Sequence, residues 1–142
     1  MTSRSDTPDF RNAGIYRSPA KHQPDKRLNI KELRNRCMGN IQLVERVLKK
    51  FQQQIPEQLA ELERAQELND TELISRILHC VKGTAASVSA NSLVSAVTEI
   101  EDLICAGHMA GVPVRIEQLR NEWESCNRVV RDIMADGTQK EY

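Results

Sequence analysis

Apolar residues recur every three or four positions along most of this chain, and this spacing restricts its fold more than any other feature. Such spacing places the apolar side chains on one face of an α-helix, whereas a half-buried β-strand would alternate apolar and polar residues. No segment alternates over a useful length. The longest helical stripe comprises Ile41, Val44, Val47, Leu48, Phe51, Ile55, Leu59 and Leu62. Aromatic residues make up only 4%, which also favours an aliphatic helical core.

Breaks in this periodicity predict where the first helices begin and end. Ile30 and Leu33 indicate a short helix with Asn29 as its cap, ended by Gly39-Asn40. The long stripe that begins at Ile41 contains Pro56, which should kink that helix or split it in two.

The second half of the chain carries clearer boundary signals. Asn69-Asp70-Thr71-Glu72 fits a capping box with Asn69 as the cap, followed by a helix over about 71–88. A break at 89–91 precedes a helix that ends near Gly107, and Pro113 opens a last helix that closes before Gly137. We expect an all-α protein, an antiparallel four-helix bundle with a short extra N-terminal helix.

Composition predicts that the bundle occupies residues 28–135. Residues 1–27 contain three prolines and few aliphatic residues, so we expect a disordered, flexible N-terminal tail. This tail carries six basic and three acidic residues and could tether an acidic partner. Residues 136–142 are predicted to form a C-terminal tail.

Charge and hydropathy exclude several classes of function. The chain has 20 basic and 20 acidic residues, which argues against a nucleic-acid binder. No apolar run approaches the roughly 20 residues of a membrane helix, and the first residues do not resemble a signal peptide. We therefore expect a cytoplasmic protein without a membrane segment. We also expect a monomer, because the bundle can bury its own core. Its cysteines should be reduced and mostly buried: Cys37, Cys80, Cys105 and Cys126.

The predicted third helix carries an unusual outward face. At about 100° per residue, Ile77, Leu78 and Val81 fall on the core side and His79 on the opposite side. The outward stripe holds Ser75, His79, Lys82, Gly83 and Ala86. A solvated face usually carries long charged and polar residues instead.

These residue types suit a histidine that is phosphorylated by another protein. A neutral imidazole is a competent nucleophile near pH 7. Lys82, three residues from His79, could offset the charge of a phosphoryl group. Gly83 costs the helix about 1 kcal/mol relative to alanine, and its benefit would be steric access for a partner.

The segment Leu78-His79-Cys80-Val81-Lys82-Gly83 resembles the H-x-x-K-G signature of histidine-containing phosphotransfer (HPt) domains. The Leu33…Gly39 lead-in, the stripe through Phe51, Asp70, and Leu93…Ile100-Glu101 also resemble the family's layout, over about residues 28–135. Ser89 departs from the glycine that the family often has ten residues after the histidine, which puts the local bend in doubt.

The resemblance implies a phosphorelay protein. His79 would accept phosphate, typically on Nε2, from a receiver-domain aspartyl-phosphate and pass it to another receiver. The partners would be response-regulator receiver domains, hybrid histidine kinases, or both. Mg²⁺ would belong to the receiver, so the chain itself needs no cofactor. The chain lacks the glycine-rich patterns GxGxxG and GxxxxGK[ST], so it is not expected to be a kinase by itself.

Further residues are candidates of lesser rank. Ser75, Arg76 and Ala86 are candidates for docking a partner. Cys80 lies about 100° around the helix and is not expected to share the site. Glu101 fits the family's layout but receives no chemical role. Cys105 and His108 have a ligand-like spacing without a second pair, so no metal site is expected.

Two other classes of function remain open. The chain could be a non-catalytic helical adaptor, including an HPt-like bundle that binds a regulator or kinase without transferring phosphate. Retention of His79 and Lys82 argues against that loss. An enzyme with its own active site is poorly supported, because no catalytic triad or paired carboxylates can be recognised.

Overall fold

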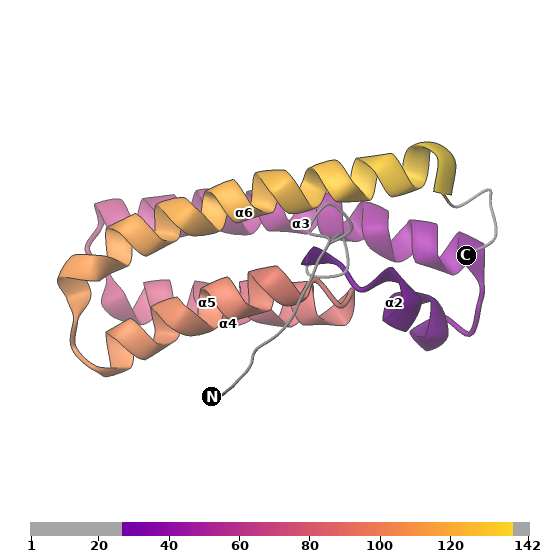
Figure 1. Ribbon diagram of the computed structural model, residues 1–142. Helices are drawn as coiled ribbons and strands as arrows, with labels where there is room; N and C mark the ends of the chain where they lie inside the picture. Colours follow the sequence, from indigo (N-terminus) through magenta and orange to yellow (C-terminus); the bar gives the residue numbers. More distant parts are fainter. Residues whose placement is uncertain (1–26, 138–142) are drawn as a thin grey trace, which may run out of the picture.

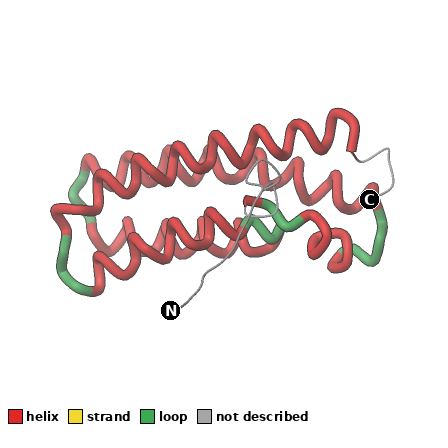
Figure 2. The backbone as a smooth tube through the Cα atoms, in the orientation of Figure 1, coloured by secondary structure: helices red, strands yellow, loops and turns green. Residues whose placement is uncertain are grey.

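The computed structural model describes residues 27–137, and every regular element in this range is helical (Figures 1 and 2). The long helices are α3 (Ile41–Glu67), α4 (Thr71–Ser87), α5 (Asn91–Cys105) and α6 (Val112–Asp132). A short α2 (Ile30–Arg36) precedes them, Met109–Gly111 is a 3₁₀ turn, and Ile133–Gly137 is a π-helical turn. The predicted all-α class is confirmed. The expected tails lie outside the described residues, except for Arg27 and residues 136–137.

The four long helices form an antiparallel bundle (Figure 1). α4 packs between α3 and α5, α5 packs against α6, and contacts between α3 and α6 close the bundle. α2 lies at the end where α3 begins. In the centre, Phe51 and Trp123 meet edge to face, with ring centroids 5.2 Å apart, a favourable aromatic geometry. The largest fully buried side chains include Phe51, Leu48, Ile55, Leu62, Leu78, Leu93, Ile100, Ile116 and Leu119.

Asparagine and aspartate side chains cap α2, α3 and α4 at their N-termini, whereas α5 and α6 begin without a side-chain cap. Asn29 caps α2 as predicted, accepting a hydrogen bond from the amide of Glu32. The predicted cap of α4 was wrong by one residue: Asp70, not Asn69, accepts from the amide of Leu73 at 3.1 Å. Asn69 instead adopts a left-handed conformation, with φ of 54°, and ends α3. Asparagine tolerates this conformation better than most residues. Asn69 therefore ends α3, and Asp70 caps α4.

Pro56 does not split α3, which is continuous over its 27 residues. Of the two expected outcomes, a kink or a split, the split is excluded, because the neighbouring turns hold the helix against the core. Ile55 and Leu59 are buried, whereas Pro56 itself is exposed. At this position water can satisfy the carbonyl that loses its intrahelical donor.

Ser89 makes the bend between α4 and α5 without the expected glycine. Its φ is 60°, in the left-handed region that glycine adopts without steric strain. Its carbonyl accepts from the amide of Asn29 at 2.9 Å, which ties the segment before α2 to this bend. Arg36 of α2 also donates to the carbonyls of Ala86 and Ser87, at 2.8 and 3.3 Å. A cation thus meets the carbonyl end of α4.

The cysteines are free, but they are not mostly buried as expected. Cys37 and Cys126 are buried, whereas Cys80 and Cys105 are exposed because they lie on the outer faces of α4 and α5. Burial raises the pKa of Cys126 to about 12, and the nearby Glu122 carboxylate acts in the same direction.

Candidate functional site

His79 lies in the middle of α4 and is exposed. The core side of the same helix is buried through Ile74, Ile77, Leu78, Val81 and Ala85. The predicted helical phase is therefore confirmed. Within residues 27–137, the imidazole of His79 has no hydrogen bond or ion pair. No described residue therefore occupies either ring nitrogen.

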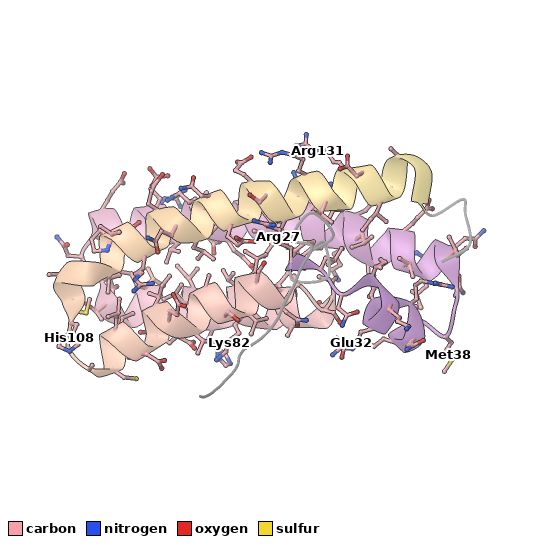
Figure 3. All side chains as sticks on the ribbon, in the orientation of Figure 1. Arg27, Glu32, Met38, Lys82, His108 and Arg131 are labelled. Carbon is pink, nitrogen blue, oxygen red and sulfur yellow. The ribbon has the colours of Figure 1, made fainter. Side chains whose placement is uncertain are left out.

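Lys82, labelled in Figure 3, follows His79 by three residues. It is not a freely solvated cation. Its ammonium Nζ lies 2.8 Å from Oε1 of Glu101 on α5. The two side chains are 33% and 24% exposed, so the pair is partly shielded from water. Sequence reasoning gave Glu101 no chemical role. The signals available were its charge and its fit to the layout that the sequence resembles, and neither gives the contact, which depends on how α5 packs against α4.

Gly83 lies one turn after His79 and is exposed. A Cβ added to it would meet no atom of the described residues within 4 Å, beyond its immediate helical surroundings. The packing of the bundle therefore does not require a glycine here, and its missing side chain leaves space for an incoming surface.

A groove between α3 and α4 runs beside Gly83. Gln58 of α3 donates to the hydroxyl of Thr84 at 3.0 Å across the groove. Cys80, expected to stand apart from the site, lines this groove together with Gly83. The lining residues are Val47, Lys50, Phe51, Gln54, Gln58, Cys80, Gly83, Thr84 and Ser87. The surface around His79 is therefore flanked by this groove on the α3 side and by the Lys82–Glu101 pair on the α5 side.

The three candidate docking residues all lie on α4 and reach the surface to different degrees. Arg76 and Ala86 are exposed, and Ser75 is half-buried. Ser75 precedes His79 by one helical turn, and Ala86 follows Gly83 by three residues.

The Hpt domain family model matches residues 46–128, more than half of the chain. The chain belongs to the Hpt domain family. The match spans most of α3 and α6 and all of α4 and α5, so it includes His79, Lys82 and Glu101. No curated protein and no solved structure gives a significant match. Membership gives this Hpt domain a general phosphotransfer role in two-component signalling, with receiver domains and histidine kinases as the partners of the family.

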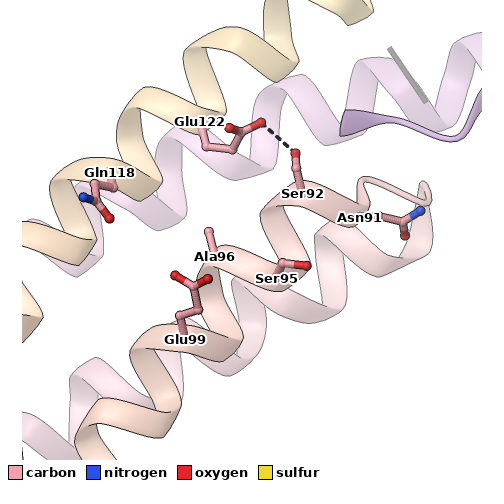
Figure 4. Close-up of a pocket in the computed structure, with 7 residues that line it drawn as sticks. All are labelled: Asn91, Ser92, Ser95, Ala96, Glu99, Gln118 and Glu122. Atoms are coloured by element: carbon pink, nitrogen blue, oxygen red, sulfur yellow. Dashed lines mark hydrogen bonds between the residues drawn. The ribbon is translucent and has the colours of Figure 1, made fainter. Parts of the chain in front are cut away.

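This Hpt domain has a second hollow, between α5 and α6 (Figure 4). Ser92 donates to Glu122 there at 2.7 Å, and Arg27 pairs with the same carboxylate at 2.9 Å. These contacts join the start of the described chain to α5 and α6, so we assign them a structural role. Over the described range, no cluster of side chains suits a metal ion and no helix is long and apolar enough to cross a membrane.

Proposed function

We propose that this Hpt domain is a histidine phosphotransfer protein that uses His79. It takes a phosphoryl group from an aspartyl-phosphate of a receiver domain and relays it to another receiver. The observation that carries the proposal is the position of His79, exposed on a rigid helix opposite the core, with Gly83 open beside it.

The transfer needs little covalent chemistry from this chain. Nε2 of the neutral imidazole attacks the phosphorus, the N–P bond forms, and the bond to the aspartyl oxygen breaks to release a carboxylate. The onward transfer reverses these steps at the second receiver. Mg²⁺ in the receiver's acidic pocket supports both transfers, while α4 supplies orientation and the Lys82 ammonium offsets phosphate charge.

Docking of the receiver would use the outward face of α4. Ser75, Arg76 and Ala86 would contact the rim of the receiver's active site, and the absent side chain of Gly83 would let that rim approach His79. We propose that the bundle, residues 28–135, works as a cytoplasmic monomer, because it buries its own apolar core.

The proposal is tested by incubating the chain with a phosphorylated receiver and Mg²⁺. We expect phosphate that is labile in acid and stable in base on the wild-type chain and none on His79→Gln. His108→Gln is the matched control, because His108 is also exposed but lies in the link after α5. Absence of label with several receivers would contradict the proposal and favour a non-catalytic adaptor.

A further inference from the structure

The ion pair between Lys82 and Glu101 is a feature that phosphate acceptance on His79 does not by itself require. It joins the helix of His79 to α5 at 2.8 Å and is the only ion pair between these two helices in the described part of the chain. The other nearby α5 carboxylates differ: Glu99 pairs with Arg115 of α6 at 2.7 Å, and Asp102 has no ion pair within residues 27–137. Among these three carboxylates, only Glu101 pairs with Lys82, a cation that lies three residues from His79 on the same helix.

We propose that Glu101 is a positioning residue that binds the Lys82 ammonium in the unphosphorylated chain. When His79 is phosphorylated, Glu101 competes with the phosphoryl group for this ammonium. This inference rests on the proposed function and concerns its energetics. Glu101 would thereby limit the stability of the phosphorylated chain, so that phosphate leaves His79 readily for the next receiver.

Charge explains the direction of this effect. A phosphoryl group brings nearly two negative charges to His79, one helical turn from Lys82. Lys82 has three N–H donors and a flexible stem, so it can move toward the phosphate or share itself between both anions. Either response weakens its bond to Glu101 and leaves that carboxylate facing a second anion. Without phosphate, Lys82 is the one ion-pair partner of this carboxylate within residues 27–137.

Partial burial strengthens the electrostatic interaction between Lys82 and Glu101. A fully solvated pair would be screened and worth little, but these side chains are only 33% and 24% exposed. Neutralising Glu101 removes the competitor and the repulsion together. We expect the equilibrium constant for phosphorylation of His79 by a receiver to rise about threefold to tenfold.

The experiment compares Glu101→Gln with Asp102→Asn in the full chain. Both variants remove one negative charge from neighbouring positions on α5, but only the first touches Lys82. Each protein is equilibrated with a phosphorylated receiver and Mg²⁺, and the ratio of phosphorylated chain to phosphorylated receiver is measured. Both substitutions are repeated in a Lys82→Gln background to form a double-mutant cycle, and thermal melting checks folding.

The proposal predicts a higher ratio for Glu101→Gln, a ratio near wild type for Asp102→Asn, and a much smaller effect of Glu101→Gln when Lys82 is absent. A purely structural role of Glu101 would lower the melting temperature without raising this ratio. If the wild type is labelled but Glu101→Gln does not exceed it, the inference is wrong and the proposed function stands. If the wild type takes no phosphate on His79, both are wrong.

Discussion

Replacing Gly83 with alanine should stabilise the fold and impair phosphotransfer. Gly83 lies in the interior of α4 and is exposed, and an added Cβ would meet no described residue within 4 Å outside its own turn of helix. The methyl group therefore causes no strain in the free protein. Alanine is favoured over glycine in a helix interior by about 1 kcal/mol, partly because it restricts the unfolded chain.

This gain converts into a measurable shift of the melting temperature. Unfolding entropy near the midpoint is about 2.1 cal/mol/K per residue, or about 0.23 kcal/mol/K for a bundle of roughly 110 residues. One kcal/mol therefore raises the midpoint by about 4 °C, which differential scanning calorimetry resolves easily. A midpoint equal to or below that of wild type would refute the reasoning about the free bundle.

The functional effect should have the opposite sign. The same methyl group occupies space that a docking receiver needs next to His79, and a small misplacement of reacting groups can cost about 100-fold in rate. We expect the initial rate of phosphotransfer to fall about tenfold to 100-fold. Asn121→Ala on the exposed face of α6 is the control, because it also raises helix propensity without altering α4. An unchanged transfer rate in Gly83→Ala would refute the access role of Gly83.

Three further predictions concern the bend after α4 and the cysteines. Ser89→Gly should raise the free energy of unfolding by about 1 kcal/mol, measured by urea denaturation. Ser89 has φ of 60° and is 1% exposed, and its hydroxyl has no hydrogen-bond partner among the described residues. A loss of stability in the variant would show that the bend is not strained. A thiol reagent at pH 8 should label Cys80 and Cys105 rapidly and leave Cys37 and Cys126 protected in the folded protein, as read by peptide mass spectrometry. The unfolded chain releases the Cys126 proton near its ordinary pKa of 9.0, whereas the folded chain keeps that proton up to a pKa of about 12. The free energy of unfolding should therefore fall as the pH rises above 9. Equal labelling of the four thiols, or stability that is flat above pH 9, would contradict the burial of Cys126.

Most of the fold could be predicted from the sequence, because helical periodicity and the breaks between helices are local signals. Asn29 as a cap, the turn at Gly39-Asn40 and the start of α6 beside Pro113 depend on a few neighbouring residues. Of the kink or split expected at Pro56, the split does not occur, because burial of Ile55 and Leu59 by distant helices outweighs the loss of one hydrogen bond. The cap at Asp70 shows how a competing neighbour can move a boundary by one residue.

Only the part of the candidate site that lies on one helix could be predicted from the sequence. The phase of α4 placed His79 and Gly83 outward, and both are exposed. The partner of Lys82 could not be found in this way, because Glu101 is 19 residues away and the contact arises from packing between α4 and α5. Cys80 lines the groove beside Gly83, but His79 is not among the lining residues of that groove, so the separation of Cys80 from His79 stays a prediction.

The central claim, that His79 carries phosphate between receivers, is tested most directly by a two-step transfer. The chain is first phosphorylated by one receiver, purified away from it, and then mixed with a second, unphosphorylated receiver and Mg²⁺. We predict that label leaves His79 of the wild-type chain and appears on the second receiver as aspartyl-phosphate. The His79→Gln chain should carry none. Phosphate that appears on the second receiver in equal amounts with His79→Gln would contradict the account.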